Sequence, residues 1–286
     1  MRWICLLPII MAISCVPKKQ KKQKVVMDSP GLLCFWDFQN ERDNGLTSKG
    51  VYNYTLTERN GQIERSPDGI FGSNSLKIKR GQWLDIKRKD CPGLDIDGKS
   101  GVSIIAWIKR EADNPWQFIA GMWNERDKQR QYGMFMSGSK KTNYISMTRT
   151  PAEHQIHGYV SDVGGATPGK SASFSYGTGK TFINKNEWYM VAYTYDNEYI
   201  RVFVNGELDS LKNHNPFKWN KPIFKGEQNG SDFTVAERAI KEWSGYPEQE
   251  NPPENDGFGG YMGGLAVFDR ALSPEQLLDI YKTTMP

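Results

Sequence analysis

The sequence is poor in the residues that most often build metal centres and nucleophilic active sites. Its 286 residues include only three histidines and four cysteines, and no CxxC pair or Cys/His cluster occurs. A structural zinc site is therefore not expected. No serine stands in a G-x-S-x-G elbow either, which argues against a serine hydrolase. The composition thus predicts no catalytic set, no metal site and no cofactor.

The body of the chain also lacks an excess of positive charge, although the formal net charge is +4. Six cations precede residue 25, in a stretch without acids. They are Arg2, Lys18, Lys19, Lys21, Lys22 and Lys24. The 37 basic residues less these six leave 31 against 33 acidic ones. A nucleic-acid-binding domain carries a concentrated basic surface, so this balance argues against that class.

No apolar run is long enough to span a bilayer, which takes about 20 residues. The run at residues 3–13 has the length of the apolar part of a signal peptide, and it follows the cationic Arg2. Residues 12–15 (AISC) then resemble the bacterial lipobox, in which cleavage before the cysteine leaves its thiol to be acylated. We therefore expect a lipoprotein signal peptide at residues 1–14 and lipidation of Cys15. The alternative is an ordinary secretory signal with a chance cysteine.

The residues after the lipobox refine this expectation. Val16, rather than Asp, follows Cys15, which by analogy with Gram-negative lipoproteins favours the outer membrane. The next residues are mostly lysine and glutamine, and like charges repel each other. We expect residues 15–29 to form an extended, solvated tether between the lipid and the domain. Contact of these lysines with anionic lipid headgroups is the alternative.

Only Cys34 and Cys91 remain for the domain, because Cys5 leaves with the signal peptide and Cys15 takes the lipid. In an oxidising compartment the two could form a disulfide. The apolar run around Cys34 is equally typical of a buried free thiol. Both outcomes stay open at this point.

From residue 30 onward, apolar and polar residues alternate with a period of two, and turn-forming residues interrupt the pattern. The candidate strands are residues 32–38, 75–79, 83–87, 102–108, 132–136, 144–147, 188–196, 199–204 and 262–268. Asn205 and Gly206 tolerate the two positive φ angles of a type I′ turn, which predicts a hairpin there.

One helix start stands out near the end of the chain. Ser273, Pro274 and Gln276 have the pattern of an N-cap, a first-turn proline and a capping-box partner. Strands otherwise dominate, and no βαβ alternation occurs. We therefore predict an all-β fold with a short C-terminal helix, as one domain over residues 30–286.

Three segments resemble the laminin-G-like, concanavalin A-like jelly-roll family of bacterial exported proteins. Residues 101–108 (GVSIIAWI) are similar to its F-T-I-S-A-W-V-K strand. Residues 187–196 (EWYMVAYTYD) with 201–206 (RVFVNG) resemble its W-x-x-V-A-x-T-Y-D … R-x-Y-V-N-G hairpin. Residues 258–273, with FGG and LAVFDRALS, resemble its closing F-x-G-x-I-D-E-V-R-I-Y-N-R-A-L-S segment. The resemblance covers about residues 31–286 and implies a two-sheet antiparallel jelly-roll sandwich, but fold alone does not determine chemistry.

One departure from that family bears on calcium. The family often has Asp-Glu in the closing strand, where this chain has Gly263 and Gly264. Two carboxylates that could ligate calcium are therefore absent from that place. Asp37, the matching acid on the first strand, is expected to have a structural role. Calcium binding has little support from the sequence.

Residues 164–171 (GGATPGKS) satisfy the P-loop pattern G-x-x-x-x-G-K-[ST]. That chemistry needs a helix directly after the loop, so that the helix N-terminus can hold phosphate. Residues 171–177 (SASFSYG) do not predict a helix. We therefore expect a glycine-rich surface loop and no nucleotide partner.

The usual signature of glycoside hydrolases on this sandwich is also missing. Those enzymes place two carboxylates on one strand face, for example as E-x-D-x-E, and no such triplet occurs. Asp95 with Asp97, and Glu111 with Asp113, have a spacing of two residues but fall in predicted loops. They are expected to be solvated loop charges.

Aromatic and planar polar side chains gather in residues 121–132 instead. Sugars present apolar C–H faces and hydroxyl groups, so flat rings beside hydrogen-bonding side chains bind them. We expect Trp123 and Tyr132 to stack on a sugar, and Asn124, Glu125 and Arg130 to hydrogen-bond with it. The alternative is that Trp123 packs in the core and the charged run is only a hairpin tip.

Residues in other loops are expected to extend this site. They are His154, His157, Trp219 and Trp243. The two histidines are three residues apart, so they could also ligate a metal with Asp162 or simply face solvent. We hypothesise that Trp123, Trp219 and Trp243 share one exposed cleft.

The sequence therefore favours recognition of a polysaccharide or other glycan outside the cell, by a protein that contacts the membrane only through its lipid. Two other functions stay open. One is a glycosidase or lyase that uses Glu125, Asp127 and His157. The other is an adhesive module that binds protein through the long segment 207–257.

Overall fold

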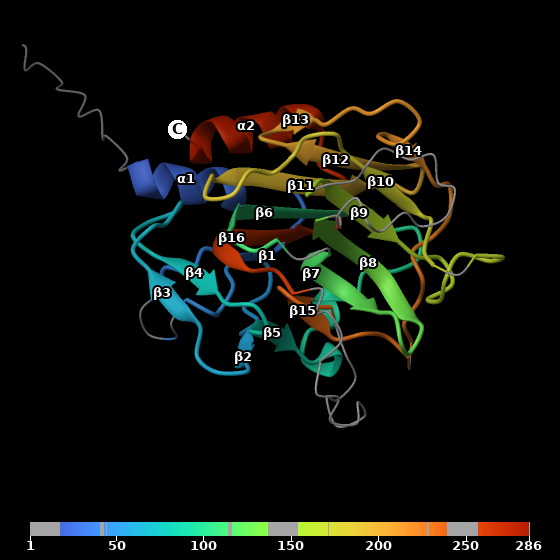
Figure 1. Cartoon of the computed structure of the whole chain (residues 1–286), viewed down its shortest axis with the longest axis horizontal. Coiled ribbons are helices and arrows are strands. Elements are labelled where there is room, and N and C mark those ends of the chain that lie inside the picture. The colour runs from blue at the N-terminus through green and yellow to red at the C-terminus, as the bar shows by residue number, and fades with distance from the viewer. Residues whose placement is uncertain are drawn as a thin grey trace, which may run out of the picture.

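Two antiparallel sheets packed face to face form the body of the chain in a computed structural model (Figure 1). The structure describes residues 18–40, 43, 45–113, 116–136, 154–170, 172–227, 229–238 and 257–285. Within these residues, strands dominate and helices are short. The predicted all-β, two-sheet antiparallel jelly-roll sandwich with a short C-terminal helix is confirmed.

The larger sheet has nine strands. They are β1 (Leu32–Trp36), β3 (Glu64–Ser66), β4 (Ser75–Ile78), β6 (Val102–Arg110), β11 (Tyr189–Tyr195), β12 (Tyr199–Val204), β13 (Glu207–Leu208), β14 (Phe217–Lys218) and β16 (Gly260–Phe268). The order is β13-β12-β11-β6-β16-β4-β3, while β1 pairs with β16 and β14 pairs with β12. The last strand of the chain, β16, therefore lies in the middle of the sheet.

The second sheet has seven strands in the order β10-β9-β8-β7-β15-β5-β2. They are β2 (Thr57–Arg59), β5 (Trp83–Ile86), β7 (Gln117–Asn124), β8 (Gln129–Met136), β9 (Ile156–Val160), β10 (Tyr176–Thr178) and β15 (Phe233–Val235). Two short 3₁₀ helices, η2 (Arg88–Asp90) and η3 (Pro92–Leu94), follow β5. The strand predicted at residues 144–147 lies outside the described residues.

The hairpin turn at Asn205 and Gly206 forms as predicted. Both residues have positive φ, 51° and 78°, as a type I′ turn requires. The turn joins β12 to β13, and Val204 pairs with Glu207 across it. The two residues Asn-Gly are thus enough to predict this reversal of the chain.

The core between the two sheets is built from the side chains on the inward-facing side of each strand. It buries Leu84 and Met122 from the seven-stranded sheet against residues such as Ile104 and Val191 from the nine-stranded sheet. Side chains of a strand alternate between its two faces, so the other residues of each strand point away from this core. Each sheet therefore has an outer face that needs a separate explanation.

Two helices cover the outer face of the nine-stranded sheet, α1 (Lys18–Met27) and α2 (Pro274–Thr284). They lie side by side along the top of the view in Figure 1. Val26 of α1 and Ile280 of α2 are buried in one cluster with Trp107 of β6. The start of α2 has the predicted capping box, in which Ser273 Oγ accepts a hydrogen bond from Gln276 N at 3.3 Å.

The helix α1 corrects the prediction for residues 15–29. An extended tether was expected there, but residues 18–27 are helical and packed against the domain. Gln23 Nε2 donates to Asp37 Oδ2 at 2.6 Å, Lys22 Nζ donates to the Ile70 carbonyl at 3.1 Å, and Val26 is fully buried. Burial on one side of the helix and these anchoring contacts offset the repulsion among its lysines. Neither α1 nor α2 is long and apolar enough to cross a bilayer.

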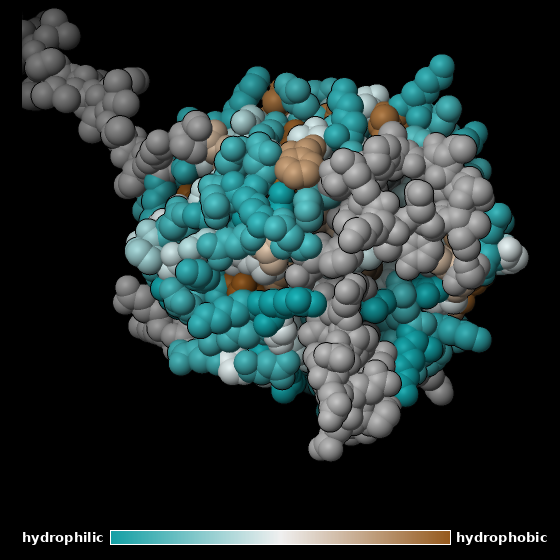
Figure 2. Space-filling view, in the orientation of Figure 1, coloured by the Kyte–Doolittle hydropathy of each residue, from teal (hydrophilic) through white to brown (hydrophobic). Residues whose placement is uncertain are grey.

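The described surface is mostly hydrophilic in the view of Figure 2, with apolar residues scattered over it. Exposed large apolar side chains among the described residues include Val51, Val163 and Phe182, which come from separate segments. Scattered apolar residues of this kind are normal on a soluble protein.

Cys34 and Cys91 are free and fully buried, so the alternative of buried thiols holds rather than the disulfide. Burial raises the pKa of both thiols to about 12. The thiolate is the reactive form of cysteine, so these two side chains are chemically protected in the folded chain.

This protection predicts the outcome of thiol labelling. At pH 8, a thiol with a pKa of about 12 is ionised in roughly one molecule in ten thousand. We expect iodoacetamide to leave Cys34 and Cys91 unmodified in the native protein and to modify both in concentrated urea, as read by peptide mass mapping. Rapid labelling of either cysteine without urea would contradict their burial.

Candidate binding face

The side of the seven-stranded sheet that is turned away from the core, here called the outer face, carries an unusual set of side chains. Strand pairing places Tyr176 beside Tyr159, Tyr159 beside Gly133, and Gly133 beside Gly121. Thr234 is next in this row, since it pairs with Gly121. Directly paired residues share a face of the sheet. The row therefore runs across β10, β9, β8, β7 and β15.

An aromatic cluster stands on this face, apart from the core between the sheets. Its members, here called the outer aromatic cluster, are Phe118, Trp123, Phe135, Tyr159 and Tyr176. Tyr159 and Tyr176 stack with ring centres 4.7 Å apart, and Trp123 meets Tyr159 edge-on at 5.4 Å. None of the five rings is more than 8% exposed. A second aromatic layer has thus formed on the outside of the sandwich.

His157 and Trp116 extend the outer aromatic cluster toward the start of β7. The His157 ring stacks on Tyr176 at 5.1 Å, with 15° between the ring planes. Trp116, which is partly exposed, meets His157 edge-on at 5.5 Å. Gly133 leaves room for these rings, because a Cβ there would lie 3.1 Å from the Phe118 ring.

The other end of the outer aromatic cluster is charged. Trp123 Nε1 donates to Glu125 Oε1 at 3.2 Å, and Arg238 Nη1 pairs with Glu125 Oε2 at 2.7 Å. The Arg130 guanidinium lies 5.8 Å from the Trp123 ring centre and 3.7 Å from the Glu125 carboxylate. Burial lowers the pKa of Arg130. One carboxylate with an exposed fraction of 40% therefore joins a tryptophan and two arginines.

Three buried polar atoms on the outer face have no hydrogen-bond partner within the described part of the chain. They are Arg130 Nε, Thr234 Oγ1 and Trp83 Nε1. Trp83 belongs to this face because its neighbour Leu84 points into the core. A buried donor without a partner costs about 1–3 kcal/mol.

Several of the predicted site residues meet at this end of the face. Trp123, Glu125 and Arg130 contact one another as described. Asn124 is 2% exposed, and its Nδ2 donates to Asp127 Oδ2 at 3.0 Å, so it holds the turn between β7 and β8 rather than facing a ligand. His157, which belongs to β9, lies on the same face, where its ring stacks with the rings of Tyr159 and Tyr176.

Tyr132 is a correction to the predicted site. Its ring is fully buried in the core between the sheets, and its hydroxyl donates to the Leu94 carbonyl at 2.6 Å. It therefore cannot stack on a sugar. The β7–β8 pairing explains the error, because Trp123 pairs with Arg130 while Met122 pairs with Tyr132. The irregularity between these pairs places Arg130 and Tyr132 on opposite faces, although they are two residues apart.

The expected cleft shared by the loop tryptophans is also wrong for the two that the structure describes. Trp219 packs against the core between the sheets and stacks with Phe217 at 6.5 Å, whereas Trp123 belongs to the outer aromatic cluster. Trp243 lies outside the described residues. His154 is 9% exposed and meets Phe182 edge-on, with its Nε2 3.7 Å from Asp113. It is therefore engaged with neighbours outside the outer aromatic cluster.

Sequence reasoning missed most of the outer aromatic cluster. Phe118, Phe135, Tyr159 and Tyr176 were not singled out, and neither was Arg238. A signal was present in β9, where His157 and Tyr159 alternate with apolar or small residues that face the core. A strand with large rings on one face and core residues on the other has two faces to bury.

No group of three or more acidic, histidine or cysteine side chains that could hold a metal ion occurs among the described residues. Asp37 is instead paired with Lys49 and Gln23, in the structural role expected for it. Gly263 and Gly264 have a packing reason, since a Cβ at either would lie 2.6 Å from the side chain of Ile70 or Phe71.

The P-loop pattern lies in a loop, as expected. Residues 164–170 form turns, Gly169 has a φ of 76°, and the next regular element among the described residues is the strand β10. The helix N-terminus that would hold phosphate is therefore not formed at the residues described here.

Comparison with known proteins agrees with this architecture. The sequence pattern of the concanavalin A-like lectin/glucanases superfamily matches residues 89–278, which is more than half of the chain. No curated protein sequence matches the chain at a significant level.

Solved structures of similar fold include domain 4 of AbnA, a GH43 extracellular arabinanase from Geobacillus stearothermophilus, in complex with arabinotriose. It is 17% identical, with a TM-score of 0.52 over 87% of this chain and 98% of that chain. A structure of botulinum neurotoxin type C, whose cell entry depends on two ganglioside molecules, is 13% identical, with a TM-score of 0.53 over 92% of this chain and 53% of that one. The binding domain of botulinum neurotoxin DC, in complex with SialylT, is 14% identical, with a TM-score of 0.53 over 89% and 51%.

This chain spans nearly all of the arabinanase domain but only about half of the neurotoxin chains. At sequence identities of 13–17%, the similarity between this chain and these structures concerns the fold alone. Together with the match over residues 89–278, it leads to one conclusion: the chain belongs to the concanavalin A-like lectin/glucanases superfamily.

Proposed function

We propose that this protein binds a polysaccharide or other glycan on the outer face of its seven-stranded sheet. The observation that carries the proposal is Trp116, a partly exposed ring beside the buried outer aromatic cluster, on a sheet face turned away from the core. The partly exposed Trp116 and Glu125 mark the two ends of this face. The sugar complexes of structural neighbours, arabinotriose among them, support the same class of ligand.

The chemistry of the face fits a sugar better than an apolar ligand. Aromatic rings pack against the C–H faces of sugar rings, and planar charged or amide groups hydrogen-bond with hydroxyls. Hydroxyl groups both donate and accept hydrogen bonds, so a glycan could pair with the exposed carboxylate of Glu125.

The proposal includes a place outside the cytoplasm. The apolar run at residues 3–13 and the lipobox-like residues 12–15 support export and a lipid on Cys15. Val16 supports the outer membrane of a Gram-negative bacterium. The helix α1 then starts three residues after Cys15, so the lipid and the domain would be close together.

The enzyme hypothesis with Glu125, Asp127 and His157 receives no support from the contacts of these residues. Glu125 pairs with two arginines, Arg130 and Arg238, so its carboxylate is already engaged. Asp127 Oδ2 accepts a hydrogen bond from Asn124 within the turn. His157 stacks on Tyr176 and meets Trp116 edge-on. We therefore favour binding over hydrolysis.

Calorimetric titration of the purified chain against plant, host and bacterial oligosaccharides, arabinotriose included, tests the proposal. We expect at least one to bind, and Glu125→Gln to weaken it about three- to fivefold, because the amide keeps the shape but loses the charge. Lys218→Gln, at an exposed lysine of β14, is the matched control and is expected to bind normally. Silence across the panel would refute binding. Release of reducing ends that Glu125→Gln abolishes would instead establish an enzyme.

A further inference from the structure

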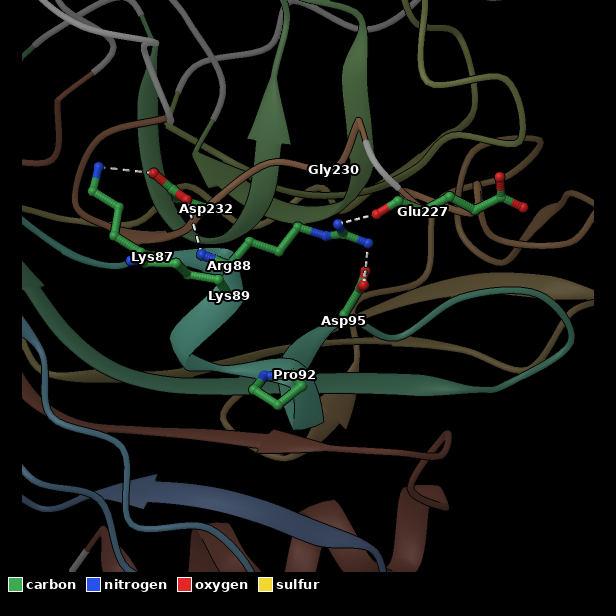
Figure 3. Close-up of a pocket in the computed structure, with 8 residues that line it drawn as sticks. All are labelled: Lys87, Arg88, Lys89, Pro92, Asp95, Glu227, Gly230 and Asp232. Atoms are coloured by element: carbon green, nitrogen blue, oxygen red, sulfur yellow. Dashed lines mark hydrogen bonds and ion pairs between the residues drawn. The ribbon is translucent and has the colours of Figure 1, made fainter.

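A pocket of about 570 Å³ lies where β5 runs into η2 and η3, beside the segment that leads into β15 (Figure 3). Its volume falls in the range of small-molecule sites, about 300–1,000 Å³. The lining residues are Lys87, Arg88, Lys89, Pro92, Asp95, Glu227, Gly230 and Asp232. None of them belongs to the outer aromatic cluster, and none has yet been given a function.

Ion pairs fix the walls of this pocket. Arg88 pairs with Asp95 and donates to the Glu227 carbonyl, and its backbone N–H donates to Asp232 Oδ1 at 2.9 Å. Lys87 Nζ lies 3.0 Å from Asp232 Oδ2. Figure 3 shows these interactions meeting around η2. Asp95 and Asp232, two of the three acidic residues that line the pocket, are therefore already paired with cations.

Cationic donors are left over. Arg88 Nε is buried and has no hydrogen-bond partner among the described residues, and the exposed Lys89 forms no ion pair with them. The Glu227 carboxylate points away from the Arg88 guanidinium in Figure 3. Guanidinium and ammonium groups, which Arg88 and Lys89 bring to the lining of this pocket, are the usual partners of an oxyanion.

The pocket adjoins the outer face. Lys87 Nζ also lies 3.4 Å from Asp85 Oδ2, and Asp85 pairs with Thr234 in the row that crosses the face. Gln129 Nε2, at the start of β8, donates to Asn229 Oδ1 at 2.7 Å, next to the pocket. A glycan that lies on the outer face could therefore place one of its residues in the pocket. The exposed Pro92 offers an apolar surface for the C–H groups of that residue.

We propose that this pocket is a subsite for an acidic sugar, whose oxyanion is either a uronate carboxylate or a sulfate ester and binds between Arg88 and Lys89. The proposal rests on the proposed glycan binding and names the kind of glycan. A chain with acidic residues would use both the rings of the outer face and the cations of the pocket. A neutral glycan would use only the rings.

The experiment titrates the full, ¹⁵N-labelled chain with D-galacturonate, D-galactose 6-sulfate and D-galactose, and follows backbone amide signals by NMR. We expect the two acidic sugars, or one of them, to shift the amides of Arg88 and Lys89, and galactose to leave them in place. Whichever of the two acidic sugars shifts these amide signals identifies the oxyanion as a carboxylate or a sulfate ester. Lys89→Gln is expected to weaken the acidic sugar about fivefold, because an exposed ion pair contributes up to about 1 kcal/mol.

Lys212→Gln is the matched control, since Lys212 is an exposed lysine in the turn between β13 and β14 of the other sheet. It is expected to bind the acidic sugars normally. Equal shifts with galactose, no shifts with either acid, or an unchanged affinity of Lys89→Gln would overturn the subsite. Failure of the proposed function has a different signature, namely that no oligosaccharide perturbs the indole signals of Trp116 and Trp123.

Discussion

Trp107→Ala is expected to lower the free energy of unfolding by about 3–5 kcal/mol, the usual cost of removing a large buried ring. Trp107 is fully buried between the nine-stranded sheet and the helices. Its ring meets Phe71 edge-on at 4.7 Å, and its Nε1 donates to Thr284 Oγ1 of α2 at 2.9 Å. The substitution therefore opens a cavity and also removes a contact that holds α2. Urea denaturation followed by fluorescence and circular dichroism measures the effect.

Two further variants keep this prediction testable if Trp107→Ala does not fold. Thr284→Val leaves the buried indole N–H without its acceptor and is expected to cost about 1–3 kcal/mol. Val163→Ala, at a residue that is 42% exposed, is the control and should change stability by less than about 0.5 kcal/mol. A loss below 1 kcal/mol for Trp107→Ala would mean that α2 does not cover this face in solution.

Trp116→Ala is expected to weaken glycan binding about thirtyfold, which corresponds to about 2 kcal/mol for a tryptophan that contacts the ligand directly. Trp116 is the partly exposed ring next to His157, so it is the part of the aromatic surface that a sugar can reach directly. Calorimetric titration with the best ligand of the oligosaccharide panel measures the change. Unfolding in urea, measured in parallel, should show that the variant keeps its fold.

Trp188→Ala is the matched control for this prediction. Trp188 is also partly exposed and also directly precedes a strand, but that strand is β11 of the nine-stranded sheet. Its Nε1 donates to Asp68 Oδ1 at 3.1 Å, outside the outer face. We expect it to bind the glycan with normal affinity. Equal losses in the two variants would place the sugar elsewhere.

The fold was predictable because local sequence patterns indicate most of its elements, and contacts with the rest of the chain do not change them. An apolar, β-branched run of strand length predicts β6, the Asn205-Gly206 pair predicts a turn, and Ser273 predicts the start of α2. The lysine-rich segment was mispredicted for the opposite reason. Local repulsion favours an extended chain, but α1 is stabilised by distant contacts, among them Asp37, that no local pattern shows.

The candidate site was only partly predictable from the sequence. Assigning a residue to one face of a sheet assumes that side chains alternate strictly between the two faces along the strand. Pairing irregularities in β7 and β8 break that alternation twice, between Phe118 and Ala120 and between Met122 and Trp123. They place Trp123 and Arg130 on the outer face. The position of a bulge depends on the partner strand, so a single strand's sequence does not reveal it.

The central position of β16 has a consequence for synthesis of the protein. β1 and β4 come early in the chain and β6 follows them, yet all three pair with β16, which is synthesised after every other described strand of this sheet. Until then the nine-stranded sheet consists of three separate pieces, namely β6 with β11 to β14, β4 with β3, and β1 alone. Their unpaired edges promote aggregation. Closure joins residues more than 150 positions apart, so folding should be slow and mainly post-translational. A chaperone that shields exposed strands would therefore be needed longest for β1 and for the β3–β4 pair, which are synthesised first.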